Sequence, residues 1–214
     1  MLLPILRISA PISVNFDGIR HFLEFLPAAT ILAGMGVYAS IEWLRSRNDL
    51  ANTALIAFLA TYFLVNISQA HTLYYPYQYL YYNQISGGSL GAQQVFKQGE
   101  VTDYWAVSYR DGLTWLNQKA EPNAYLYVAI GDYLATIPSL NWLRSDIQFV
   151  SASQLGELHA KGRTIYMMHI TRPSFYKDAA KACDGTRPVY QKWVGGISVM
   201  QIINMNDCPP EAFQ

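Results

Sequence analysis

Two long apolar runs dominate the first third of the chain. Residues 25–41 (FLPAATILAGMGVYASI) carry no charged side chain, and residues 50–67 (LANTALIAFLATYFLVNI) repeat the pattern after a charged turn at 45–49. Extended to 22–44 and 50–68, each run is long enough for a helix that crosses a hydrocarbon core of about 30 Å. The pattern predicts a transmembrane helical hairpin, with a buried helix of a water-soluble protein as the alternative for the first run.

Basic residues near these runs predict how the hairpin is oriented in the membrane. Arg45 and Arg47 lie in the turn, and no Lys or Arg follows until Lys97. Since short cytoplasmic loops are enriched in Lys and Arg, the turn is predicted to be cytoplasmic, and the chain after about residue 69 is predicted to lie outside. Arg7 and Arg20, which precede the first run, favour the opposite orientation.

From residue 102 onward the apolar positions follow shorter helical and strand periods. Trp105, Tyr109, Leu113 and Leu116 recur at spacings of four, four and three, which predicts a helix over 103–118 with Asp103 as its N-cap. The other predicted elements are strands at 124–130, 146–150 and 164–170, helices at 153–160 and 173–181, and a hairpin of 189–194 with 197–204 around two glycines. This order predicts a small α/β domain at 102–214, with a mixed sheet that ends in an antiparallel pair.

A tyrosine-rich stretch at 70–101 lies between these two regions. Six of the nine residues from Tyr74 to Tyr82 are tyrosine. Tyrosine is typical of the boundary between acyl chains and water, which predicts an interfacial aromatic linker between a membrane region at 1–69 and the domain. The same rings are suited to stacking on sugars or holding a polyprenyl head group, and the two interpretations are compatible. The glycine-rich residues 87–91 are interpreted as a turn.

Composition narrows the functional classes. Hydrophobic residues fill 51% of the 214 positions and charged residues only 14%, against about 25% in soluble proteins. The 15 basic and 15 acidic side chains cancel, so no net charge favours nucleic acid as a partner. No phosphate-binding glycine motif, metal-ligand spacing or catalytic triad can be assembled, so the sequence predicts no cofactor, no metal site and no catalytic residue.

Two small groups of residues suggest sites. Asp17, Arg20 and His21 precede the first run, where a cation pair beside an acidic residue suits a lipid phosphate at the outer membrane surface. Ordinary interfacial anchoring is the alternative for this group. Cys183 and Cys208 bracket the predicted hairpin, and in an oxidising compartment they are expected to form a disulfide rather than remain two free thiols.

Three further stretches carry recognisable motifs, in the same order as in a known family. Residues 17–27 (DGIRHFLEFLP) match a DG-x-RHFLF-x-x-P pattern, residues 75–88 (YPYQYLYYNQISGG) match HPYQYxYFNxLxGG, and residues 103–116 (DYWAVSYRDGLTWL) match DYWGxSYREAxxWL. Together they resemble the C-terminal region of bacterial GT-C glycosyltransferases, polytopic enzymes related to protein O-mannosyltransferases and lipid A aminoarabinose transferases. Tyr75 departs from the pattern by replacing His, and Glu24 by replacing an apolar residue.

The resemblance implies a polyprenyl-phosphate-sugar-dependent transferase of the bacterial inner membrane, with its C-terminal domain in the periplasm. In such enzymes the catalytic acidic residue lies in the first outer loop, many helices before the matched region. This chain is therefore expected to be a C-terminal portion, inactive by itself, whose partners are membrane lipid, the polyprenyl-phosphate-linked sugar and the N-terminal transmembrane part. The alternative is a non-catalytic, membrane-anchored domain that binds or scaffolds. The residues expected to bind lipid phosphate or substrate are Asp17, Arg20, His21, Tyr77, Tyr79, Asp103 and Trp105.

Overall fold

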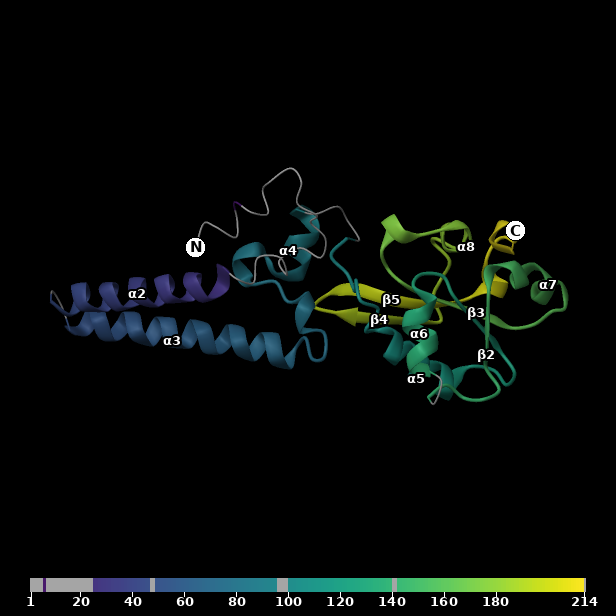
Figure 1. Cartoon of the computed structure of the whole chain (residues 1–214), viewed down its shortest axis with the longest axis horizontal. Helices are drawn as coiled ribbons and strands as arrows, with labels where there is room; N and C mark the ends of the chain where they lie inside the picture. Colours follow the sequence, from purple (N-terminus) through teal and green to yellow (C-terminus); the bar gives the residue numbers. More distant parts are fainter. Residues whose placement is uncertain (1–5, 7–24, 47–48, 96–99, 140–141, 214) are drawn as a thin grey trace. The chain divides into compact units, whose positions relative to one another are not determined.

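The computed structural model describes residues 6, 25–46, 49–95, 100–139 and 142–213, which divide into two compact units, Met1–Val65 and Asn66–Gln214. The first unit holds α2 (Leu26–Arg45) and most of α3 (Asp49–Thr72) (Figure 1). Within the described ranges, α3 is the one helix long and apolar enough, by length and composition, to cross a membrane. The predicted pairing of the two helices as a hairpin stays a prediction, and residues 22–24 of the first predicted span lie outside the described part.

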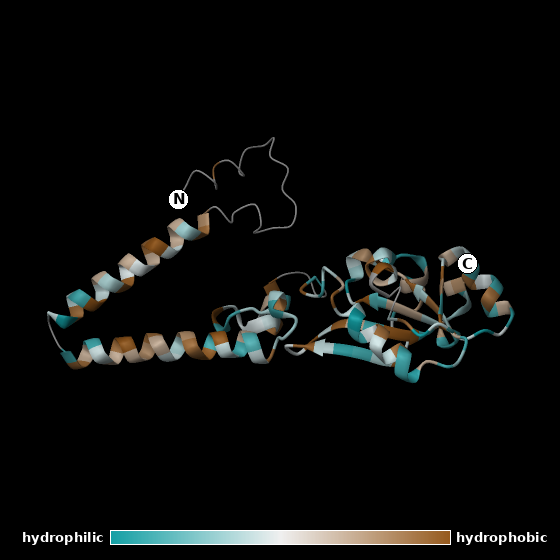
Figure 2. Ribbon diagram, turned by 60° about the horizontal axis from the view of Figure 1, so that its bottom comes forward, coloured by the Kyte–Doolittle hydropathy of each residue, from teal (hydrophilic) through white to brown (hydrophobic). Residues whose placement is uncertain are grey.

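Neither long helix buries a residue in the structure, and Figure 2 shows α3 covered largely by hydrophobic positions. Several hydroxyls on these helices bond backbone carbonyls of the preceding turn. Ser40 donates to the carbonyl of Gly36 at 2.8 Å, and Thr53 donates to that of Asp49 at 3.0 Å. Such bonds to the preceding turn let an apolar helix carry hydroxyls without leaving polar groups unpaired in lipid.

The second unit is built on a five-stranded sheet in the order β2-β1-β3-β5-β4. Its strands are β1 (Tyr125–Val128), β2 (Gln148–Val150), β3 (Ile165–Ile170), β4 (Tyr190–Val194) and β5 (Ile197–Asn204). The first three are parallel, whereas β5 runs antiparallel to both β3 and β4. The predicted mixed sheet with an antiparallel pair at one edge is therefore confirmed.

Helices cover both faces of this sheet (Figure 1). On one face, α5 (Tyr109–Lys119) and α6 (Asp132–Ser139) pack on a core around Leu126, Met168 and Met200. On the other face, α7 (Leu155–Ala160) and α8 (Asp178–Ala182) pack on a core around Ile165 and Met167. All six residues of β3 are buried, because the strand lies between two covered faces.

A third core joins the tyrosine-rich stretch to the β4–β5 hairpin. Tyr74, Tyr77 and Leu80 are buried against hydrophobic residues of the hairpin, so part of the stretch predicted as a linker belongs to the interior of the second unit. The turn at the hairpin tip, Gly195–Gly196, has positive φ at both residues, and a Cβ on Gly195 would lie only 2.4 Å from the Tyr74 hydroxyl oxygen. Only glycine fits this close approach.

The prediction of a plain turn at 87–91 is wrong, because α4 (Gly88–Val95) begins inside it. Gly87 does adopt the left-handed conformation of a turn, with φ of 75°. Ser89 and Ala92 then face the third core, and the Ser89 hydroxyl donates to the carbonyl of Leu80 at 3.0 Å. Burial of this face stabilises a helix that the glycine content alone disfavours.

The two cysteines are joined in the structure. Cys183 follows α8 and Cys208 follows a short 3₁₀ helix (Met205–Asp207), and their Cα atoms lie 5.2 Å apart. This separation is typical of a disulfide. The bond links two loops beside the second core and closes the chain across the β4–β5 hairpin.

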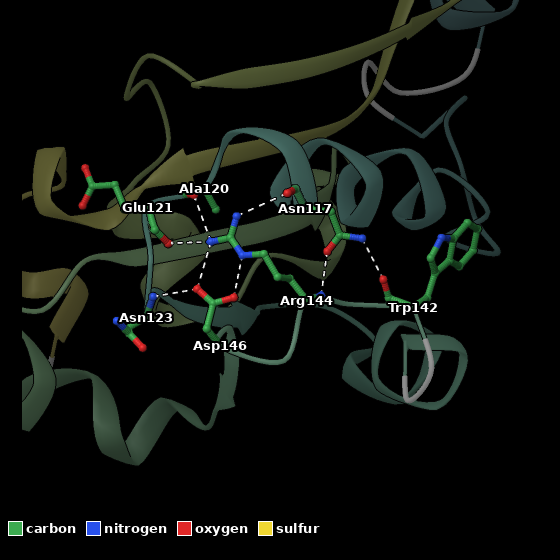
Figure 3. Close-up of polar contacts among 7 residues, drawn as sticks. All are labelled: Asn117, Ala120, Glu121, Asn123, Trp142, Arg144 and Asp146. Carbon is green, nitrogen blue, oxygen red and sulfur yellow. Dashed lines mark hydrogen bonds and ion pairs between the residues drawn. The ribbon is translucent and has the colours of Figure 1, made fainter.

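Arg144 ties the end of α5 to the loop before β2 (Figure 3). Its guanidinium donates two bonds to the Asp146 carboxylate, at 2.5 and 3.0 Å, and further bonds to the carbonyls of Asn117, Ala120 and Glu121. These carbonyls lie at the helix C-terminus, where backbone acceptors lack partners within the helix. The bonds from Arg144 lower the pKa of Asp146 to about 2.

We expect Asp146→Asn to lower the thermal unfolding midpoint at neutral pH but to change it little near pH 2. The folded pKa of about 2 lies below the unfolded value of about 3.9. The stabilisation is therefore fully present above the unfolded pKa and is lost as the pH falls through the folded one. Unfolding midpoints of wild type and variant between pH 7 and 2 test this, with Asp207→Asn, an exposed carboxylate, as the control. A difference that does not shrink with acid would contradict it.

Candidate functional site

The candidate site lies at the carboxyl ends of the adjacent parallel strands β1 and β3. From β1 the chain runs to α6 on one face, and from β3 it runs to α8 on the other face. In open α/β sheets, a point where neighbouring strands continue to opposite faces leaves a crevice that commonly binds ligands. A cavity of about 270 Å³ lies at this point. It is lined by Ala129, Ile130, Gly131, Ser174, Phe175, Tyr176 and Lys177.

The size and lining of this cavity restrict its ligand. Pockets for drug-sized ligands span about 300–1,000 Å³, so a volume of about 270 Å³ suits a single sugar ring or a group of that size rather than a dinucleotide. Ser174 brings a hydroxyl, Lys177 an ammonium and Phe175 an aromatic ring. Burial, with a contribution from Asp184, raises the pKa of Tyr176 to about 12, so its phenol stays protonated at neutral pH.

An arginine packed between aromatic rings borders the cavity. The guanidinium carbon of Arg172 lies 4.9 Å from the ring centroid of Tyr104 and 4.5 Å from that of Phe175. Its Nε is 2.8 Å from a carboxylate oxygen of Glu100. Tyr104 in turn meets the edge of Trp105, with ring centroids 5.2 Å apart. We call Tyr104, Trp105, Arg172 and Phe175 the arginine–aromatic cluster. Phe175 belongs to both the cluster and the cavity.

A fully buried carboxylate positions this cluster. Asp103 accepts four hydrogen bonds: from the Tyr79 hydroxyl at 2.6 Å, the Trp105 amide at 3.1 Å, and the Ser108 amide and hydroxyl at 2.7 and 2.6 Å. These bonds hold the turn in which Ala106 has a φ of 53°. Tyr104 and Trp105 remain 43% and 49% exposed on that turn, so their rings face outward.

The prediction that Asp103 caps a helix over 103–118 is wrong, because α5 begins at Tyr109. Asp103 instead bonds the amide of Ser108, directly before the helix. Tyr109 continues the connection to the cavity, because its hydroxyl donates to the carbonyl of Ile130 at 2.5 Å. Two consecutive residues at the start of α5 therefore make both connections. Ser108 bonds Asp103 in the turn, and Tyr109 bonds Ile130 in the cavity lining.

The structure brings four of the expected binding residues together, but in different roles. Asp103 and Trp105 belong to the turn, Tyr79 bonds Asp103 from the tyrosine-rich stretch, and the rings of Tyr77 and Tyr79 lie 6.4 Å apart between centroids. Trp105 and Tyr79 are partly exposed, whereas Tyr77 is 2% exposed and donates to Asp111 at 2.9 Å. The ring of Tyr77 is therefore closed to stacking on a sugar. The other three expected residues, Asp17, Arg20 and His21, lie outside the described residues.

Tyrosine hydroxyls around this site are held in the protonated form. Burial and the Asp103 carboxylate raise the pKa of Tyr79 far above its ordinary value, and burial and Asp111 do the same for Tyr77. Both phenols are therefore hydrogen-bond donors to carboxylates at every physiological pH. In the part of the chain that the structure describes, no three His, Cys, Asp or Glu side chains are grouped so that they could hold a metal ion.

Sequence reasoning missed Arg172, Phe175 and the cavity. No local motif marks these residues, since Arg172 is 69 positions after Asp103, and tertiary contacts such as the hydrogen bond between Thr102 and Thr171 bring the two segments together. Comparisons with known proteins add no assignment: no family model, no curated protein and no solved structure matches this chain. The function is therefore argued from the site itself.

We expect Tyr79→Phe to lower the free energy of unfolding by about 1.5 kcal/mol, the lower end for a hydrogen bond to a charged group, because the ring is partly exposed. The change removes one of the four donors to the buried Asp103 carboxylate. Tyr75→Phe makes the same chemical change at a ring that is 70% exposed and serves as the control. Equal unfolding free energies for the two variants, measured by denaturant titration, would rule out this role of Tyr79.

Proposed function

We propose that this chain is the C-terminal portion of a polyprenyl-phosphate-sugar-dependent membrane glycosyltransferase, and that its folded domain holds the lipid-linked donor or the acceptor. The observation that carries the proposal is the shared position of Phe175 in the cavity and in the arginine–aromatic cluster. Aromatic faces stack on the apolar faces of sugars, and the planar fork of arginine suits phosphate oxygens. The cavity volume fits one sugar ring.

The membrane features support the same assignment. In the proposal α2 and α3 form a hairpin in the bacterial inner membrane, with the turn at 45–49 in the cytoplasm and the domain in the periplasm. The length and apolar composition of α3 support an anchor of this kind. The bond between Cys183 and Cys208 supports an oxidising compartment for the domain, since disulfides persist outside the cytoplasm.

The domain contributes binding rather than proton transfer in this proposal. Transfer of a sugar to a hydroxyl needs a carboxylate positioned to accept a proton. Asp103, whose carboxylate bonds the amide of Trp105, already accepts four hydrogen bonds and acts as a positioning residue. In the resembling enzymes the catalytic acidic residue lies in an earlier outer loop, so the proposed partner is the N-terminal transmembrane part that carries it.

We expect Arg172→Ala to weaken binding of a polyprenyl-phosphate-linked sugar by about 10- to 150-fold, which corresponds to the loss of about 1.5–3 kcal/mol from hydrogen bonds to a charged group. Arg172→Lys should recover part of the affinity, because an ammonium keeps the charge but not the planar fork. The measurement is titration of the full chain in detergent with undecaprenyl phosphate carrying one sugar.

Arg187→Ala, which removes an exposed arginine outside the cluster, is the control and should bind like wild type. Undecaprenyl phosphate without the sugar should bind more weakly than the glycosylated lipid, because the cavity then stays unfilled. The same affinity for wild type, Arg172→Ala and Arg172→Lys, with all three folded by circular dichroism, would remove the proposed role of the cluster.

The proposed topology predicts opposite labelling of two introduced cysteines. A cysteine at Ser46, in the turn, should resist a membrane-impermeant thiol reagent in intact cells, whereas one at Ser151, an exposed loop position of the domain, should react. The native cysteines are paired and leave no background of free thiols in the described residues. The reverse labelling pattern would overturn the orientation and the periplasmic assignment together.

A further inference from the structure

The segment 73–95 exposes an unusual number of large apolar side chains for a part of a folded domain. It contains all six tyrosines of the tyrosine-rich stretch together with α4, and it belongs to the second compact unit. Isolated exposed apolar residues are normal on protein surfaces, but a run of them in one short segment indicates a binding surface. The exposed residues are Leu73 at 67%, Tyr75 at 70%, Ile85 at 86%, Leu90 at 55% and Val95 at 81%.

These side chains are presented by a fixed framework. The opposite side of α4 is anchored to the domain, since Ser89 is buried and bonds both the Leu80 carbonyl, at 3.0 Å, and the Tyr74 hydroxyl, at 2.8 Å. The side chain of Leu90 lies beside the hairpin turn, where a Cβ on Gly196 would come within 3.3 Å of it. The apolar side chains therefore point out of a segment that the third core holds in place.

The segment carries no charge and is joined directly to the last turns of α3. Residues 50–96 contain no Asp, Glu, Lys or Arg, whereas about a quarter to a third of a typical water-facing surface is charged. The Tyr81 hydroxyl donates to the side chain of Asn66 at 2.7 Å, and the Gln84 amide donates to that of Gln69 at 3.1 Å. Both partners lie near the end of the helix whose composition suits a membrane.

We infer that segment 73–95 lies in the interfacial layer of the lipid bilayer, with Ile85, Leu90 and Val95 inserted among the acyl chains. The inference rests on the proposed membrane anchoring by α3, which brings a charge-free surface to the boundary where α3 ends. An anchored segment with exposed apolar side chains can bury them in the plane of this boundary. The residues inferred to insert are aliphatic, whereas Tyr74 and Tyr77 of the expected aromatic belt are buried in the domain.

The test places an environment-sensitive fluorophore on single cysteines introduced at Ile85 and Val95. The labelled full chain is reconstituted into phosphatidylcholine vesicles, with and without lipids that carry a nitroxide quencher near the head group. Both labels should shift to shorter wavelength and lose intensity with the quencher lipid. A label at Ser151, an exposed polar loop position, should do neither.

A second label at Phe58, within α3, separates this inference from the proposed anchoring. Quenching of Phe58 by a nitroxide in mid-chain, together with unquenched and water-exposed labels at 85 and 95, would overturn the inference and leave the anchor in place. Labels at 85 and 95 that shift but are not quenched by lipid would also overturn it, because protein would then cover them. An unquenched label at Phe58 would overturn the anchoring and the inference together.

Discussion

The buried carboxylate of Asp103 joins the tyrosine-rich stretch to the turn that precedes α5. Its four donors come from the tyrosine-rich stretch, from its own turn and from the residue before α5. Burying a carboxylate costs free energy unless its oxygens are hydrogen-bonded. A change in the turn that broke these bonds would therefore be unfavourable, which restricts the turn to its observed geometry. That geometry sets where Tyr104 and Trp105 emerge and where α5 starts, and Tyr109 carries the constraint on to the cavity. The positions of Tyr104 and Trp105 in the arginine–aromatic cluster therefore depend on the hydrogen bonds to Asp103.

Much of the sheet could be predicted because its signals are local. Buried strands are visible in the sequence as short apolar runs, and the pair Gly195–Gly196 predicts a hairpin turn from local sequence alone. The helices that the sequence did not predict are α4 and α6, which are stabilised by tertiary packing rather than by local helical propensity. Residues 132–139 contain Pro138 and have little helical propensity, yet α6 forms because Ala135 is fully buried on the sheet. Likewise α4 begins with glycine and is stabilised by the third core.

The candidate site was predictable only in part, for a related reason. The motif at 103–116 marks Asp103 and Trp105, and the tyrosine run marks Tyr79, because each is recognisable within a few neighbouring residues. Arg172 and Phe175 follow β3, and their position beside Tyr104 depends on strand order and on opposite crossovers from β1 and β3. A sequence gives no direct measure of such crossovers. The motif places Trp105 among the expected binding residues, and its ring is 49% exposed, whereas no local signal marks Arg172, the cation that packs on Tyr104.

The abundance of tyrosine follows from the absence of charge in residues 50–96. In the proposed membrane setting, this segment needs polar links to the domain it joins, and Lys, Arg, Asp and Glu would be costly close to lipid. Tyrosine supplies an apolar ring and one hydroxyl, and at Tyr77 and Tyr79 a raised pKa keeps that hydroxyl neutral and able to donate. Where a tyrosine bonds a carboxylate, the charge lies on the domain side, at Asp103 or Asp111. The resulting links are Tyr74 to Ser89, Tyr77 to Asp111, Tyr79 to Asp103 and Tyr81 to Asn66. Tyr77 and Tyr79 thus connect the charge-free segment to charged residues of the domain, while Tyr74 and Tyr81 bond uncharged partners within residues 50–96.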